Sequence, residues 1–234
     1  MKMNKKQLAA IVVAAGNGRR MGIADRKQYL KLGEVPLLAV ALHHLTKRKD
    51  IAQLVLVVPA DDMDRVRREI LVHCPDPQDV ELVTGGRERR DSVWAGIKAL
   101  HNGITHVAIH DGARPLVTEK MLDRVFESGF NEGAAILALP VTDTVKQVDS
   151  DGVIGRTVPR INLWLAQTPQ VFRRDWLVKA YGAVPENDSV TDDAEILEKA
   201  GYQVCVVMGS RENIKITIPE DLKLAEAILS SRRQ

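Results

Sequence analysis

The chain has 234 residues, of which 45% are hydrophobic, which is enough for one large α/β domain spanning residues 1–234. Its 33 basic and 31 acidic residues leave a net charge of +2, which excludes the global positive field of a nucleic-acid or membrane-surface binder. Only three each of Phe, Trp and Tyr are present, too few for binding nucleic acid by base stacking.

The cysteine content and the hydropathy pattern point to the cytoplasm. Cys74 and Cys205 are far apart and have neither metal-site nor C-x-x-C spacing, so we expect free thiols in a reducing compartment. The basic residues 1–6 lead into an apolar run of only about eight residues, which does not favour a cleavable signal. No stretch approaches the roughly eighteen apolar residues of a membrane-spanning helix.

The first informative stretch is an apolar run, Leu8 to Ala15, followed directly by the glycine-rich segment Gly16-Asn-Gly-Arg-Arg-Met-Gly22. A short unbroken Ile/Val/Ala run predicts a strand buried on both faces, as in parallel sheets. Glycines let the backbone turn its N–H groups toward a ligand, and Arg19, Arg20 and Lys27 add three cations nearby. An anion cradle with fixed cations suits a nucleoside triphosphate.

Two other interpretations of this glycine segment remain. Gly16, Gly18 and Gly22 are spaced one residue off the dinucleotide fingerprint, and no carboxylate lies near position 40 to hold a ribose, which disfavours a dehydrogenase. The sequence also lacks a G-x-x-x-x-G-K-[ST] loop. A purely structural turn is the plain alternative.

Apolar strand runs alternate with helical patterns along the rest of the chain. This order predicts a Rossmann-like, doubly wound, mostly parallel twisted sheet with helices on both faces and ligands at the carboxyl ends of the strands. We expect strands at 8–15, 51–59, 80–84, 106–111, 133–140 and 202–208, and helices at 36–45, 61–71, 91–100 and 118–129.

Two of these strands end in residues suited to a ligand. Gly85-Gly86 follows the third strand, and Asp91 and Ser92 are cap-type residues opening the next helix; a loop with a helix cap is the alternative interpretation. Asp111 ends the fourth strand, where a carboxylate can bind magnesium or sugar hydroxyls, or simply brace the following turn. His110 is expected to face the packed sheet.

The region from Thr142 to Val158 departs from the strand–helix rhythm. Two polar–apolar stretches flank an Asp-Gly turn, which predicts a β-hairpin, and an isolated hairpin needs another surface to be stable. Thr168-Pro169 is expected to fix a sharp turn. Further on, Asp192 with Glu195 has capping-box spacing, although Asp192 and Asp193 are alternative metal ligands.

A strand over Asn213–Ile218 leading into a Pro-started terminal helix completes the pattern.

The glycine segment resembles the signature of the sugar-phosphate cytidylyltransferases, in particular the branch acting on 2-C-methyl-D-erythritol 4-phosphate. The residues that carry the resemblance are Ala14-Ala-Gly-Asn-Gly-Arg-Arg-Met-Gly22 and Lys27-Gln-Tyr-Leu30. The resemblance extends over about residues 8–229 and includes V-T-D-D-A and N-I-K-I-T-x-P-E-D-L.

The resemblance implies a nucleotidyltransferase that joins CTP to a polyol phosphate and releases pyrophosphate, with Mg²⁺ or another divalent cation and a homodimer whose arm, about residues 142–158, clasps the second subunit. It implies that Arg20 and Lys27 are transition-state cations and that Arg160 and Lys215 position the polyol phosphate. Its remaining implied contacts are, for the nucleotide, Ala14, Ala15, Gly16, Asn17, Gly18, Gly85, Gly86 and Ser92, and, for the polyol, Asp111, Arg114 and Thr144. Asp111 is also the candidate metal ligand because of its place at a strand tip, and the sequence leaves open whether it binds metal or only the polyol.

Three alternatives to this function stay open from the sequence. A ribitol 5-phosphate cytidylyltransferase would share the fold and the chemistry. A nucleotide-binding module without turnover would not require both cations and the arm residues. An oxidoreductase is disfavoured by the missing ribose-binding acid.

Overall fold

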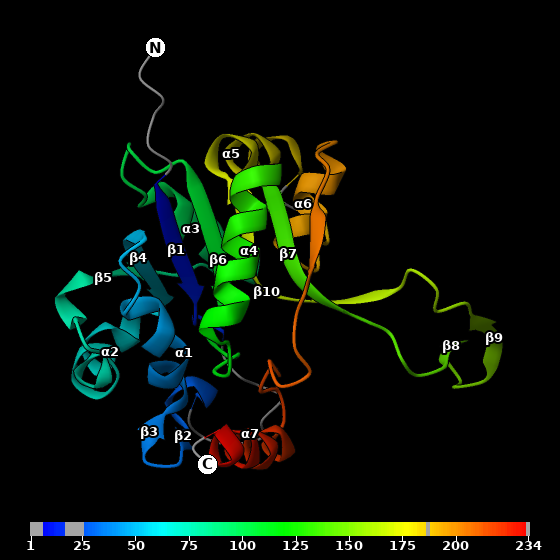
Figure 1. The fold of residues 1–234 in the computed structure, drawn as a ribbon, viewed down its shortest axis with the longest axis horizontal. Helices are drawn as coiled ribbons and strands as arrows, with labels where there is room; N and C mark the ends of the chain where they lie inside the picture. Colours follow the sequence, from blue (N-terminus) through cyan, green and yellow to red (C-terminus); the bar gives the residue numbers. More distant parts are fainter. Residues whose placement is uncertain (1–6, 17–25, 186–187, 233–234) are drawn as a thin grey trace.

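The structure is a computed structural model that describes residues 7–16, 26–185 and 188–232. Its centre is a seven-stranded sheet with strand order β11-β7-β10-β6-β1-β4-β5 (Figure 1). Within this sheet, all neighbouring strands run parallel except β10, which is antiparallel to both of its neighbours. The strands are β1 (Leu8–Val13), β4 (Ile51–Val58), β5 (Val80–Thr84), β6 (His106–Asp111), β7 (Ala134–Pro140), β10 (Trp164–Arg173) and β11 (Cys205–Met208).

Strand β1 shows why the first apolar run folds as predicted. Leu8, Ala10 and Val12 belong to the core on one face of the sheet, and Ala9 and Ile11 to the core on the other, all fully buried. The first core is covered by α1 (Leu37–Thr46), α2 (Met63–Glu69) and α4 (Glu119–Glu132), and the second by α3 (Arg89–Lys98), α5 (Arg174–Ala183) and α6 (Asp193–Lys199). The prediction of a Rossmann-like sheet with helices on both faces is confirmed.

A smaller third core lies at the carboxyl end of the sheet. Here α7 (Pro219–Arg232) packs Ala225 against Leu37, Leu116 and Ile216, beside the two-stranded β2 (Lys31–Leu32) and β3 (Val35–Pro36). This packing holds the segment that carries Lys215 next to the sheet. Short 3-10 turns occur at Lys27–Tyr29, Ala60–Asp62, Leu71–His73 and Pro77–Asp79.

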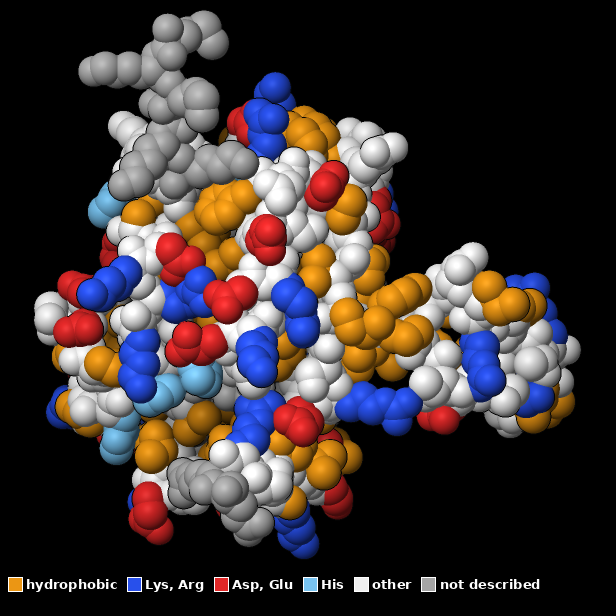
Figure 2. Space-filling view, in the orientation of Figure 1, with side chains coloured by type: hydrophobic (Ala, Val, Ile, Leu, Met, Phe, Trp, Pro, Cys, Tyr) orange, Lys and Arg blue, Asp and Glu red, His pale blue; other side chains and the backbone are white. Residues whose placement is uncertain are grey.

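The predicted hairpin is present and forms an arm that protrudes from the body (Figure 1). It consists of β8 (Val145–Val148) and β9 (Ile154–Val158), which pair with each other and not with the central sheet. Val148, Val153 and Ile154 are exposed, and Figure 2 shows hydrophobic side chains on the arm surface. Nothing in the described part of this chain covers them.

Three local predictions are wrong. The segment Asn213–Ile218 forms no strand; Ile216 instead donates its N–H to the carbonyl of Ala113. Thr168-Pro169, a cis peptide bond, lies inside β10 at a register shift rather than at a sharp turn between elements. Helix α3 begins at Arg89, two residues earlier than predicted.

Other local predictions hold. The Thr118 hydroxyl accepts the Met121 N–H at the start of α4, as expected. The predicted end of this helix near Gly129 is too early, because the helix continues to Glu132 and is capped by Gly133, which has a φ of 86°. Both cysteines are free thiols. Over the residues described, none of the helices has the length and apolar character needed to cross a membrane.

Candidate active site

A cavity of about 220 Å³ opens at the carboxyl ends of β1 and β6, where the sequence places its ligand-binding residues. Its wall is formed by the end of β1, the loop before α3, the tip of β6 and the segment before α7. We call it the first cavity. Among the predicted site residues, it is lined by Ala14, Ala15, Gly16, Lys27, Gly86, Ser92, Asp111 and Lys215.

The end of β1 is held by contacts from two directions. Ala14 donates its N–H to the Val57 carbonyl at 2.8 Å and accepts at its own carbonyl from the Gln28 amide at 3.0 Å. Gln28 is 3% exposed, so this side chain is a buried brace for the backbone that forms the cavity wall. The sequence analysis did not single it out. The predicted residues Asn17, Gly18 and Arg20 lie outside the described residues.

Gly85 and Gly86 follow β5 at points where neighbouring segments come too close to leave room for a side chain. A Cβ on Gly85 would lie 2.3 Å from the Ala15 Cβ, and one on Gly86 would lie 2.2 Å from the Asp91 Cβ. Gly85 thus brings the β5 loop against the β1 loop without itself lining the first cavity. Gly86 lets the backbone turn over the start of α3.

Helix α3 starts with a reciprocal cap. The Glu88 side chain accepts from the backbone of Asp91, and the Asp91 carboxylate accepts the Glu88 N–H at 3.0 Å. Ser92, 2% exposed, accepts the Gly86 N–H at 3.2 Å and donates to the Glu88 carbonyl at 3.0 Å. Asp91 and Ser92 therefore shape the loop from inside the helix, whereas the sequence predicted that they open it.

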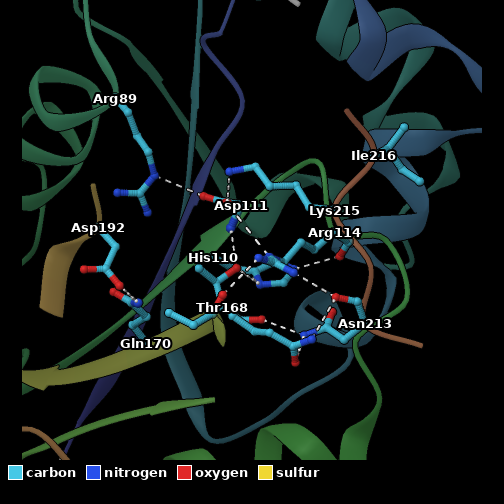
Figure 3. Close-up of polar contacts among 12 residues, drawn as sticks. Arg89, His110, Asp111, Arg114, Thr168, Gln170, Asp192, Asn213, Lys215 and Ile216 are labelled. Atoms are coloured by element: carbon cyan, nitrogen blue, oxygen red, sulfur yellow. Dashed lines mark hydrogen bonds and ion pairs between the residues drawn. The ribbon is translucent and has the colours of Figure 1, made fainter. Parts of the chain in front are cut away.

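Asp111, at the tip of β6, lies among three cations (Figure 3). Its carboxylate is 3.1 Å from Arg89 Nε, 2.7 Å from Lys215 Nζ and 3.9 Å from Arg114 Nε. Burial alone would raise the pKa of Asp111, but Arg89, Lys215 and Arg114 hold this pKa well below its usual range. The side chain is 10% exposed and ionised at neutral pH.

Behind Asp111, a chain of hydrogen bonds fixes the backbone of the strand tip. Asp111 donates its N–H to the Thr168 hydroxyl at 3.0 Å, and that hydroxyl contacts His110 Nδ1 at 3.1 Å. His110 Nε2 lies 3.0 Å from the Arg114 carbonyl. Because a carbonyl can only accept, Nε2 carries the proton and donates, and Nδ1 accepts from the Thr168 hydroxyl. Burial lowers the pKa of His110 to about 4, which keeps it neutral. As predicted, His110 faces the packed interior.

A second cavity, about 230 Å³, lies on the other side of Asp111. Strand β10 provides Thr168 and Gln170 to its wall, and the start of α6 provides Asp192. Arg89, Asp111 and Lys215 line both cavities, so these three side chains form the shared wall between them. Arg114 lines only the second cavity, and its guanidinium donates to the Asn213 carbonyl at 2.8 Å.

Asp192 caps α6, as the sequence predicts. Its carboxylate accepts the Glu195 N–H at 2.9 Å and the Gln170 amide at 2.7 Å. The Glu195 carboxylate accepts from Thr191 rather than from Asp192, so the box is displaced by one residue. Asp193 is 1% exposed at its side chain and binds Arg89 and Tyr181, which leaves it no face toward either cavity.

Comparison with known proteins identifies the family. The model of the 2-C-methyl-D-erythritol 4-phosphate cytidylyltransferase family matches residues 8–231. The chain belongs to this family. It is 46% identical over 226 residues to the 2-C-methyl-D-erythritol 4-phosphate cytidylyltransferase of Syntrophus aciditrophicus, covering 96% of this chain and 97% of that protein.

Solved structures of cytidylyltransferases agree with this assignment. The crystal structure of 4-diphosphocytidyl-2C-methyl-D-erythritol synthase from Anaerococcus prevotii superposes with a TM-score of 0.82 at 31% identity, covering 96% of this chain and 99% of that chain. The 2-C-methyl-D-erythritol 4-phosphate cytidylyltransferase structure from Thermus thermophilus gives a TM-score of 0.76 at 30% identity, covering 94% and 98%.

The arm residues of this cytidylyltransferase stand apart from the two cavities. Thr144 and Arg160 are exposed, and the Arg160 guanidinium donates to the Thr142 carbonyl of its own arm. Within the described ranges, neither residue lines the first or the second cavity. Among the described residues, the structure therefore brings together the predicted residues of the body around the two cavities and leaves those of the arm outside.

Among the described acidic residues of the cytidylyltransferase site, Asp111 is the candidate ligand for a metal ion. Over the described residues, no group of three or more His, Cys, Asp or Glu side chains is arranged so that it could hold a metal ion. Glu88 and Asp192 cap helices, whereas Asp111 faces both cavities. Magnesium commonly binds through one or two carboxylates plus substrate phosphates and water, and a single aspartate on the shared wall fits that pattern.

Proposed function

We propose that this protein transfers CMP from CTP to 2-C-methyl-D-erythritol 4-phosphate, giving a CDP-polyol and pyrophosphate in isoprenoid biosynthesis. The observation that carries the proposal is the shared wall. Two cavities meet at Arg89, Asp111 and Lys215, one beside the glycine loops and one lined by polar side chains. Family membership supports the identity of the two substrates.

In this proposal CTP occupies the first cavity. The backbone at Ala14–Gly16 and at Gly86 lies close enough to meet a flat pyrimidine and its ribose, because both loops lack bulky side chains there. Lys27, whose Nζ is 3.1 Å from the Ile216 carbonyl, lies at the same wall to meet the triphosphate. Arg20 would add a second cation, as the resemblance implies.

The acceptor occupies the second cavity. Its wall carries Arg114, Thr168 and Gln170, which suit hydroxyl groups, and Lys215 suits the phosphate. An oxygen of this phosphate forms the new bond to the α-phosphorus of CTP. The bond from the α-phosphorus to the bridging oxygen breaks, and pyrophosphate leaves with that electron pair.

A phosphate nucleophile is already ionised near neutral pH, so the reaction needs no strong general base. Catalysis then consists of positioning and of stabilising the charge that develops on the α-phosphoryl group. Lys215 and Arg89 are the described cations of the shared wall, where the two substrates would meet, and Lys27 lines the first cavity beside it. The neutral, buried His110 takes no part in proton transfer in this scheme.

We also propose a divalent cation, a homodimer and a cytoplasmic location. Asp111 would hold the cation, which would neutralise triphosphate charge when bound. The exposed apolar residues of the arm support a partner subunit that receives the arm, as does the exposed Arg160, which lines neither described cavity of its own chain. A cytoplasmic location supplies CTP and keeps both cysteines reduced.

The test is a pyrophosphate-release assay on the purified protein with CTP and Mg²⁺. We expect turnover with 2-C-methyl-D-erythritol 4-phosphate and little with ribitol 5-phosphate. Preference for ribitol 5-phosphate would reassign the acceptor, and absence of turnover with both, alongside measurable CTP binding, would favour a binding module.

A further inference from the structure

The residue that joins the two cavities most directly is one that the sequence analysis did not select. Arg89 is the first residue of α3 and lines both cavities. Its Nε is 3.1 Å from Asp111, and its Nη2 is 2.7 Å from Asp193 (the Asp111 contact is drawn in Figure 3). One guanidinium thus connects the tip of β6 to the first residue of α6.

Asp193 is built to hold that guanidinium. Its side chain is 1% exposed, it lines neither cavity, and its other oxygen accepts the Tyr181 hydroxyl at 2.7 Å. Tyr181 in turn stacks on Trp94 of α3 with ring centroids 5.4 Å apart. A buried carboxylate has a large desolvation cost unless it is paired, so the pairing with Arg89 is strongly favoured.

The consequence for Asp111 is geometric. Lys215 reaches one carboxylate oxygen at 2.7 Å and Arg89 reaches the other, so the two cations approach from different sides and fix the plane of the group (Figure 3). Arg89 suits this task because its planar fork binds two carboxylates through separate nitrogens, which a lysine ammonium on a flexible stem does not reproduce.

We propose that Arg89 is a positioning residue for cytidylyl transfer: anchored by Asp193, it fixes the Asp111 carboxylate at the wall shared by the two cavities. The proposal rests on the proposed function. Arg89 acts through Asp111, and Asp193 and Tyr181 act through Arg89. The nucleotide contacts at Ala14–Gly16 and Gly86 do not depend on this chain of contacts, so the main effect falls on the acceptor and on kcat.

The experiment compares steady-state kinetics of wild type, Arg89→Lys and Asp193→Asn, measured as pyrophosphate release with each substrate varied in turn. We expect kcat/KM for the acceptor to fall by about tenfold or more in both variants, because small misplacements of reacting groups are costly, while KM for CTP stays within about twofold. Tyr181→Phe, which leaves Arg89 and Asp193 paired, should show a smaller loss in the same parameter.

Arg90→Lys is the matched control. Arg90 is the next residue of the same helix, donates to the backbone carbonyls of Tyr181 and Val184, and lines neither cavity. The same substitution there should leave both KM values and kcat within about twofold. Melting temperatures of all variants separate loss of fold from loss of alignment.

A double-mutant cycle decides between positioning and a merely structural role. If Arg89 acts through Asp111, then Arg89→Lys causes no further loss in an Asp111→Asn background. An equal fractional loss in both backgrounds, or an unchanged acceptor kcat/KM in Arg89→Lys, would overturn the proposal. Inactivity of the wild-type protein itself would instead count against the proposed function, so the two failures are distinct.

Discussion

The body of the molecule and its arm hold their predicted site residues in opposite ways. In the body, Asp111 has contacts from Arg89, Lys215 and Thr168, each within 3.1 Å. On the arm, the Arg160 guanidinium donates to the carbonyl of Thr142 of the same arm, and apolar side chains close to it in the sequence, such as Ile161 and Leu165, are exposed. The predicted site residues of the body are organised by contacts within this chain, whereas those of the arm lie outside both cavities, which is why we propose that a partner subunit receives the arm.

The largest effect should come from removing a cation of the body. Lys27→Ala is expected to lower kcat by about 10²-fold or more, because one preorganised charge contact at a transition state is typically worth about 3–4 kcal/mol. The assay is pyrophosphate release at saturating substrates. Lys31→Ala, at an exposed lysine outside both cavities, is the control and should retain turnover. Near-normal turnover of Lys27→Ala would remove this residue from the catalytic set. The same result is expected for Arg20→Ala.

Subunit complementation can test the role of the arm separately from that of the body. Arg160→Ala should be nearly inactive, and mixing it with Lys27→Ala should restore activity, because one hybrid site then carries both lesions and the other carries neither. In a shared-site dimer the hybrid should approach about half of wild-type activity. Subunit exchange is verified by mass-tagged dimers.

Deleting residues 145–154 sharpens the same contrast. We expect a monomer by light scattering, with an intact sheet by circular dichroism and almost no turnover. A fully active monomer, or failure of the mixed variants to recover after verified exchange, would contradict the shared site and leave the arm without a role in catalysis.

A smaller effect should follow from filling the space at Gly86. In Gly86→Ala the new Cβ would meet the Asp91 Cβ at 2.2 Å, so the loop before α3 must shift. We expect kcat/KM for CTP to fall by about tenfold and discrimination against UTP to weaken, because base selection depends on pairing polar groups in a fixed geometry. Gly182→Ala, where a Cβ meets nothing within 4 Å, is the control. Unchanged selectivity would show that this loop does not border the base.

The last effect concerns the pH dependence of stability, with no change in turnover. Burial lowers the pKa of His110 from 6.5 to about 4, so below pH 6.5 the unfolded chain binds a proton that the folded chain does not. The free energy of unfolding should therefore fall as pH decreases from 6.5 toward 4, by at most about 3 kcal/mol from this residue. Urea unfolding at several pH values would measure the slope. His110→Gln should flatten it and His73→Gln should not; an equal slope in all three proteins would contradict the assignment.

The features predictable from the sequence are those governed by local patterns. The apolar run of β1 predicted a strand buried on both faces, and the Asp-Gly turn predicted the hairpin, because each feature depends on a few neighbouring residues. The position of the first cavity was also predictable, because parallel strands place their carboxyl ends at one edge of the sheet.

The missed residues depend on contacts between distant segments. Gln28 braces Ala14 from a neighbouring turn, and Thr168 reaches Asp111 from a strand 57 positions later. Ile214-Lys215-Ile216 alternates like a strand, yet Ile216 is buried against α7 rather than in a sheet. Alternating apolar and polar residues indicate that one side of a segment is buried, and here Ile216 is buried because α7 packs against this loop.

The position of β10 has a consequence for how the protein is made. This strand enters the sheet between β6 and β7, after the whole arm has been synthesised, and β7 has no direct pairing with β6. On the ribosome, β1, β4, β5 and β6 can therefore assemble early as successive parallel units, while β7 waits for its first partner strand. Thr168 emerges with β10 itself and Lys215 later still, so a nascent chain can form much of the first cavity before the wall of the second cavity exists.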